Sequence, residues 1–285
     1  MNFKEEMFET ILDKLSSFDN AKYDYFHSAQ TLIPSRKEII SILKNIQSVM
    51  FPDYFHLSEN EGKRPYEVLD IIYNKLKEQI TAAFAFCAEC DNTGLDVDSL
   101  VSEIMSKIPE IKEKLIKDVQ AIYEGDPAAR APEEIILSYP GFYAISIYRI
   151  AHEFYTRRIP YIARLMTEFS HEKTGIDIHA GATIGEYFFI DHGTGIVIGE
   201  TTTIGDHVRI YQGVTLGAKS FELDENGNPV KGVKRHPDIG NNCIIYANAT
   251  ILGGNTKIGD GCVIGGNVWL THSVPAGEVV YYNAK

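Results

Sequence analysis

The strongest constraint on the fold is a six-residue repeat of branched aliphatic residues in the C-terminal part of the chain. The repeated residues are Ile178, Ile184, Ile190, Ile198, Ile204, Ile210, Leu216, Ile239, Ile245, Ile251, Ile258, Ile264 and Leu270. A period of six fits neither an α-helix, with a period near 3.6, nor an ordinary strand, with a period near 2. It fits a solenoid in which each hexad is a short strand with a tight corner, and three hexads complete one triangular coil. The sequence therefore predicts a parallel β-helix with these side chains on its axis and coils stacked about 4.8 Å apart.

The repeat is interrupted at three places, and polar chemistry should gather there because a solenoid wall is passive. The step lengthens to eight residues after Ile190 and to seven residues after Ile251. After Leu216 the step is 23 residues, so residues 218–234 must leave the wall. This insertion is polar and contains Gly, Pro and Asn, as is typical of an extruded surface loop.

Glycine content and apolar periodicity divide the chain in two. Eighteen of the 23 glycines lie after residue 176. Before it, apolar residues recur at three- and four-residue steps, as from Val101 to Ile122, which indicates amphipathic helices. Pro109 interrupts that stripe and suits the first turn of a new helix. We therefore expect an α+β chain, with a helical domain over residues 1–175 and a solenoid domain over residues 176–285.

The composition excludes several classes of partner. Apolar residues make up 44% and charged residues 23%, which is typical of a soluble globular chain. The net charge of −12 argues against nucleic acid or an anionic membrane surface as a partner, because both need a basic footprint. No apolar stretch approaches the roughly 20 residues of a membrane span, and the N-terminus shows no secretory signal. Four cysteines are too few for a disulfide scaffold, so we expect a cytoplasmic location.

Acidic and histidine side chains cluster at the interruptions of the repeat. Asp191 and His192 lie in the eight-residue step, Asp177 lies about one coil earlier, and Arg235 and His236 close the extruded loop. Histidine has the pKa to act as a base near neutral pH, and a carboxylate fixes its tautomer. A corner histidine bonded only to backbone is the structural alternative for His192 alone. The combination of these residues points to a site.

Asp126 precedes Pro127, and this pair is typical of a helix start, with Asp as the N-cap and Pro as the first helical residue. The same carboxylate could also bind an ammonium group of a substrate.

Cys87 and Cys90 have C-x-x-C spacing. They follow an Ala- and Phe-rich helical stretch without a preceding strand, and no second C-x-x-C exists to complete a zinc site. We expect two buried helix cysteines rather than a redox pair or metal ligands.

Several segments of the chain, taken together, closely resemble the bacterial serine acetyltransferases. They are DPA at 126–128, GFYAISIYRIAH at 141–152, DIHAGATIG at 177–185, IDHGTGIVIGET at 190–201, VTLG at 214–217 and RHP at 235–237. The resemblance covers roughly residues 120–280. It implies a left-handed hexapeptide-repeat β-helix and the reaction of L-serine with acetyl-CoA to give O-acetyl-L-serine and CoA, which supplies cysteine biosynthesis.

The resemblance also implies roles for individual residues. His192 would be the general base, oriented by Asp177, and His236 or a backbone N–H near Ala218 would stabilise the oxyanion. Residues implied to bind the amino-acid substrate are Asp126, Asp191, Arg235, His236 and Glu200. Acetyl-CoA would lie between the solenoids of adjacent subunits, against Ala218, Ala247 and Gly266. No metal is expected.

The resemblance implies partners as well. L-cysteine would compete for the serine site as a feedback inhibitor, and the assembly would be a homotrimer or a dimer of trimers. Residues 280–285 lack the usual Gly-x-Pro-Ala element and extended tail, which puts docking of O-acetylserine sulfhydrylase in doubt. Arg130 stands where the family usually has a second Asp.

Three alternatives lead to different expectations. The same fold could acetylate a sugar or another hydroxyl-bearing acceptor, although Asp126 and the helical region argue against this. A zinc hydratase would need three histidines that converge at a subunit interface, for which His192, His207 and His236 are the candidates. A solenoid without catalytic activity would give no reason for acid and histidine clusters at the interruptions.

Overall fold

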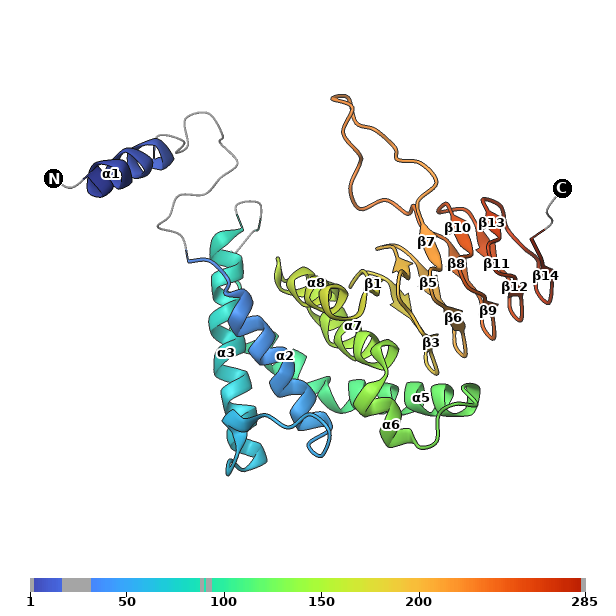
Figure 1. The fold of residues 1–285 in the computed structure, drawn as a ribbon, viewed down its shortest axis with the longest axis horizontal. Coiled ribbons are helices and arrows are strands. Elements are labelled where there is room, and N and C mark those ends of the chain that lie inside the picture. The colour runs from blue at the N-terminus through green and yellow to red at the C-terminus, as the bar shows by residue number, and fades with distance from the viewer. Residues whose placement is uncertain (1–2, 17–31, 88–89, 91–93, 283–285) are drawn as a thin grey trace.

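The fold is known from a computed structural model, which describes residues 3–16, 32–87, 90 and 94–282 (Figure 1). The helices are α1 (Phe3–Ser16), α2 (Arg36–Met50), η1 (Ser58–Asn60), α3 (Pro65–Phe86), α4 (Val97–Ser106), α5 (Ile108–Gly125), α6 (Pro132–Ser138), α7 (Pro140–Thr156) and α8 (Ile162–Thr174). Within these described residues, no helix is long and apolar enough to cross a bilayer.

Short parallel strands follow the helices. They are β1 (Asp177–Ile178), β2 (Thr183–Ile184), β3 (Phe189–Asp191), β4 (Val197–Ile198), β5 (Thr203–Ile204), β6 (Arg209–Tyr211), β7 (Thr215–Gly217), β8 (Asp238–Ile239), β9 (Ile244–Ile245), β10 (Thr250–Leu252), β11 (Lys257–Ile258), β12 (Val263–Ile264), β13 (Trp269–Leu270) and β14 (Val279–Val280).

The strands form three sheets that are the three faces of a solenoid. Sheet A is β1-β4-β7-β10-β13, sheet B is β2-β5-β8-β11 and sheet C is β3-β6-β9-β12-β14. Each aliphatic residue of the six-residue repeat lies in a strand and is buried, and in sheet A Ile178 pairs with Ile198 and Ile198 with Leu216. The predicted solenoid is therefore confirmed. Its handedness stays a prediction.

The interruptions of the repeat fall at corners of the solenoid. Residues 192–196 turn from sheet C into sheet A, and we call this edge the C–A corner. Residues 199–202 turn from sheet A into sheet B at the A–B corner. The predicted extruded loop leaves the same A–B corner after β7 and returns at β8 (Figure 1).

The helical part agrees with the predicted amphipathic stripe. Pro109 lies in the first turn of α5, as expected. Buried apolar residues continue from α4 through α5, from Val101 to Ile122. Helices give way to strands at Gly175, which ends α8 in a left-handed conformation. The division into two domains at this residue stays a prediction.

The prediction that Asp126 begins a helix was wrong. Asp126 instead follows the last residue of α5, and its Oδ1 accepts a hydrogen bond from the backbone N–H of Ala128 at 2.8 Å in a local turn. The next helix begins at Pro132, after Ala131 in an extended conformation. Asp126 also precedes a proline and is extended, but the chain after it closes a turn in which the N–H of Ala129 donates to the carbonyl of Asp126 at 3.1 Å, so the helix starts only at the second proline.

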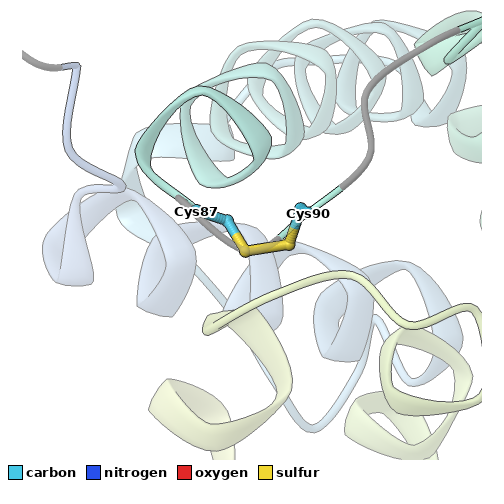
Figure 2. The surroundings of a disulfide bond; sticks show 2 residues. All are labelled: Cys87 and Cys90. Carbon is cyan, nitrogen blue, oxygen red and sulfur yellow. A yellow bond between two sulfur atoms is a disulfide. The ribbon is translucent and has the colours of Figure 1, made fainter.

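The prediction of buried helix cysteines was also wrong. Helix α3 ends at Phe86, and Cys87 and Cys90 lie beyond it, partly exposed and joined by a disulfide (Figure 2). Their Cα atoms are 5.4 Å apart, within the range that a disulfide requires. Because the helix ends at Phe86, the C-x-x-C spacing brings the two side chains together.

We expect the Cys87–Cys90 disulfide to contribute modestly to stability, because it closes a short loop and removes little entropy from the unfolded chain. Replacing both residues with serine should lower the free energy of unfolding by about 2 kcal/mol. Denaturant unfolding with and without a reductant measures this. The double variant keeps only Cys243 and Cys262, which are buried free thiols, so a reductant has no disulfide to break in it. A reductant effect that persists in this variant would contradict the assignment.

A buried ion pair fastens the helices to the first coil. Asp118 of α5 and Arg149 of α7 form two hydrogen bonds, of 2.6 and 2.8 Å, and both side chains are almost fully buried. Arg149 also donates to the carbonyl of Gly185, and Asp118 accepts from the N–H of Phe188. The pair therefore sets the position of α5 and α7 against the turn between β2 and β3.

Candidate active site

His192 lies at the C–A corner in a backbone conformation that few side chains adopt. It follows β3 directly, its side chain is exposed and its φ is 56°. In later coils the residues in register with His192 are Gln212, Ala247 and Gly266, and the left-handed residues are the next ones along the chain, Gly213, Asn248 and Asn267. Glycine and asparagine adopt this region readily, whereas a bulkier side chain held there is more common at functional sites.

Asp177 lies one coil before the corner that carries His192. Its backbone N–H donates to the carbonyl of Ile196 at 2.9 Å, and it pairs with Val197 across sheet A. Within the described part of the chain, no hydrogen bond joins the side chains of Asp177 and His192. Their action as a pair stays a prediction.

Asp126, Tyr139 and Asp191 form an acidic group beside His192. The Tyr139 hydroxyl donates to Oδ2 of Asp126 at 2.7 Å. This hydrogen bond, burial and the negative charges of Asp126, Glu134 and, least, Asp191 raise the pKa of Tyr139 to about 12. Tyr139 therefore stays protonated and fixes the Asp126 carboxylate. Sequence reasoning missed Tyr139, although its place before Pro140 marked it as a helix start.

The close approach of α7 to β3 explains why these residues meet. A Cβ atom on Gly141 would lie 2.7 Å from the carbonyl oxygen of Ile190, closer than real side chains come. Only glycine allows the first turn of α7 to contact the end of β3 in this way. Tyr139, two residues earlier, is thereby brought next to Asp191.

A second polar group lies at the A–B corner. Arg235 forms an ion pair with Glu200, and the Tyr155 hydroxyl donates to the other oxygen of Glu200 at 2.7 Å. Burial acts to raise the pKa of Glu200, but the hydrogen bonds from Tyr155 and Arg235 outweigh it and lower that pKa. Glu200 is therefore charged and holds the guanidinium of Arg235.

A cavity of about 920 Å³ lies beside this pair, and the extruded loop forms its other wall, with Phe221 and Gly232 among the lining residues.

His236 is a neutral imidazole at the same corner. Its side chain is buried, and burial together with the charge of Arg235 lowers its pKa to about 4. Nδ1 accepts a hydrogen bond from the backbone N–H of Thr201 at 3.1 Å. The ring lies against Gly199, where a Cβ atom would come within 2.2 Å of Nε2.

His179 belongs to this corner group, although sequence reasoning did not single it out. Its ring packs edge-on against Tyr155, and burial lowers its pKa. The signal was present in the repeat, because His179 follows β1 just as Gly199 follows β4.

The residues expected to contact the coenzyme fall on both corners. Ala247 and Gly266 are stacked on the C–A corner in coils above His192, and a Cβ atom on Gly266 would lie 3.2 Å from the carbonyl oxygen of Ala247. Ala218 follows β7 at the A–B corner. Small residues therefore occupy this position of the C–A edge in two successive coils, at Ala247 and Gly266.

The predicted site residues thus form two groups on different edges of one solenoid. Asp126, Asp191 and His192 lie at the C–A corner, and Arg235 and His236 lie at the A–B corner with Glu200. Sheet A separates the two edges. Within one chain, His192, the expected base, and Arg235, the expected partner of the substrate carboxylate, therefore belong to different groups.

Within one chain, the three histidines of the zinc alternative do not converge. His192 and His236 lie at different corners, and His207 stacks on Tyr187 at the third, with ring centres 4.3 Å apart. Among the residues that the structure describes, no group of three or more His, Cys, Asp or Glu side chains is arranged to hold a metal ion.

Comparison with known proteins agrees with the resemblance in the sequence. Residues 74–146 match the family model described as serine acetyltransferase, N-terminal. A plasmid-encoded serine acetyltransferase of Synechococcus elongatus is 47% identical over 260 residues, which cover 87% of this chain and 81% of the relative.

Solved structures are similar as well. Serine acetyltransferase 1 of Entamoeba histolytica, in complex with L-cysteine, is 40% identical with a TM-score of 0.74, covering 84% of this chain and 86% of that one. The soybean serine acetyltransferase in complex with serine is 28% identical with a TM-score of 0.57, covering 86% and 97% of the two chains.

Proposed function

This chain belongs to the serine acetyltransferase family, and from that premise we propose how its two corner groups carry out the reaction. The enzyme transfers the acetyl group of acetyl-CoA to the hydroxyl of L-serine and forms O-acetyl-L-serine and CoA. The observation that carries the assignment of residues is the pair of complementary groups, acidic at the C–A corner and basic at the A–B corner.

His192 acts as the general base. The serine hydroxyl is a weak nucleophile until a base removes its proton, and an exposed imidazole beside two carboxylates is suited to that task. As the proton passes to His192, the serine oxygen bonds to the thioester carbonyl carbon. The C–S bond then breaks, and the imidazolium returns the proton to the departing CoA thiolate. Asp177 orients the ring and stabilises its charged form.

The two groups recognise opposite ends of the amino acid. Asp126 and Asp191 bind the ammonium group, and Arg235 binds the carboxylate with the geometry that a guanidinium offers. Glu200 keeps the guanidinium in place through its ion pair. A sugar acceptor carries neither charge, so this arrangement favours serine over the alternative acceptor. L-cysteine differs from serine only in its thiol and would bind the same groups as an inhibitor.

The coenzyme lies along the C–A edge, where the small residues Ala247 and Gly266 leave room for the pantetheine arm, with the thioester beside His192. Ala218, at the other corner, contacts it from the neighbouring copy. His236 is neutral with Nδ1 already engaged, so its Nε2–H is the donor for the oxyanion.

A complete site forms where the C–A corner of one copy meets the A–B corner of another, as in a homotrimer or a dimer of trimers. The prediction that docking of O-acetylserine sulfhydrylase is in doubt stays untested, because it concerns a C-terminal segment of which residues 283–285 lie outside the described part of the chain.

Co-expression of two inactive variants tests the shared site. We expect His192→Asn and Arg235→Ala each to lose most serine acetylation. Every trimer that contains both variants has one site in three that combines an intact C–A corner with an intact A–B corner, so about a third of the wild-type rate should return, or about a quarter if six copies mix at random. The rate is measured on assemblies purified through a different tag on each variant. Mixed assemblies as inactive as either parent would show that the site lies within one chain.

A further inference from the structure

The Thr201 side chain makes three hydrogen bonds to the segment that carries the basic group. Its Oγ1 accepts from the backbone N–H of Arg235 at 3.0 Å and from that of His236 at 3.1 Å. The same oxygen lies 2.9 Å from Nδ1 of His236. Because both accepting positions of the hydroxyl are used, its own proton is directed to Nδ1. One hydroxyl thus holds both the backbone and the ring of His236.

These contacts determine where the proton of the His236 ring lies. Nδ1 faces the Thr201 hydroxyl and also the Thr201 backbone N–H at 3.1 Å, and a backbone N–H only donates. Nδ1 must therefore be an acceptor without a proton, and a neutral ring carries its proton on Nε2. In the described part of the chain Nε2 has no hydrogen-bond partner, so this N–H is free to donate to a reactant.

We propose that Thr201 is a positioning residue for acetyl transfer, which fixes His236 as the Nε2–H tautomer and aims that donor into the site. The inference rests on the proposed function of His236 and adds the residue that acts through it. Glu200 cannot replace Thr201 in this role, because its contacts go to the side chains of Arg235 and Tyr155.

The charged and titratable groups around the His236 ring do not determine its tautomer, which depends on the hydrogen bonds to Thr201. Arg235, His179 and Lys234 disfavour a positive charge on His236, and Glu200 favours one. These groups influence whether the ring is charged. None of them is hydrogen-bonded to either ring nitrogen, so they do not select which nitrogen of the neutral ring carries the proton.

The neighbouring threonine supplies a matched control. Thr202 is also buried, but its hydroxyl has no hydrogen-bond partner in the described part of the chain. We expect Thr201→Val to lower kcat/KM for serine about 10- to 100-fold, because a misplaced donor loses alignment with the reacting carbonyl. Thr202→Val should keep the wild-type rate, and Thr201→Ser, which restores the hydroxyl, should recover most of it.

Nitrogen-15 NMR of protein labelled at histidine measures which ring nitrogen carries the proton. The signals of His236 are assigned by their absence in the His236→Asn variant. We expect a non-protonated Nδ1 and a protonated Nε2 in the wild-type protein. We also expect His236 to gain a proton at higher pH in Thr201→Val than in Thr202→Val, since protonation at Nδ1 no longer breaks the bond to the hydroxyl.

A protonated Nδ1 in the wild-type protein overturns the proposal, and so does identical titration of His236 in the two valine variants. The wild-type measurement does not depend on any Thr201 variant, and Thr201→Ala serves if the valine variant does not fold. Either failure would leave wild-type serine acetylation untouched, whereas failure of the proposed function would appear as wild-type protein that does not acetylate serine.

Discussion

Replacing His192 with asparagine is expected to lower kcat for serine acetylation about 10²- to 10⁴-fold, the range that a general base contributes. Asparagine retains a polar side chain but does not accept a proton near neutral pH. The KM values for serine and acetyl-CoA should change much less, because the proposed binding groups are other residues. Release of CoA thiol at saturating concentrations of both substrates measures the effect.

Asparagine is the matched replacement because the backbone at this corner is left-handed, with φ of 56° at His192. Asn248 and Asn267, one register position further along this corner in later coils, adopt the same conformation. We therefore expect the variant to fold with a melting temperature equal to or above that of the wild type. A stable variant that retains wild-type kcat would remove His192 as the base.

The solenoid was predictable because its physical determinant is local and repeated. Each coil places one aliphatic side chain per face on the axis, so the period of six is visible in the sequence before any long-range contact is known. The interruptions were predictable for the same reason. The extra residues after Ile190 and Leu216 cannot fit in the wall of the solenoid, and in the structure they form a corner and the extruded loop.

The arrangement of the site was less predictable, because it depends on contacts between segments distant in the chain. The sequence predicted that Asp126 is a helix cap. In the structure its carboxylate accepts a hydrogen bond from the Tyr139 hydroxyl, and the helix begins at Pro132. The role of Tyr139 depends on how α7 meets β3, which rests on the absence of a side chain at Gly141.

The separation of the two groups follows from the order of the repeats, which the prediction from sequence did not use. His192 and Arg235 each lie at an interruption of the repeat, and the sequence alone placed both in one site. The order of the strands assigns them to different edges of the prism, with sheet A between. Periodicity indicates that a residue is at a corner, whereas the count of strands from the start of the solenoid tells which corner.

Breaking the buried ion pair is expected to be the most destabilising single change. In Arg149→Met the carboxylate of Asp118 stays buried without its cation, which should cost about 3–5 kcal/mol of unfolding free energy. The exposed pair of Arg36 and Glu172 is the control, and Arg36→Met should cost less than about 1 kcal/mol. Chemical denaturation measures the free energy of unfolding of the two variants. Equal decreases would contradict the conclusion that the ion pair of Arg149 holds α5 and α7 against the first coil.

The same change should weaken serine binding, although Arg149 lies away from the proposed substrate groups. Asp118 is in α5, which ends beside Asp126, and Arg149 is in α7, which begins beside Tyr139. Loosening these helices from the first coil separates Asp126 from Asp191, whose position is set by β3. We expect the KM for serine to rise in Arg149→Met while the KM for acetyl-CoA is kept, since Ala247 and Gly266 belong to later coils. Adding Asp118→Leu removes the unpaired charge and should recover part of the stability. An equal rise in both KM values would indicate a general loss of structure rather than displacement of the acidic group.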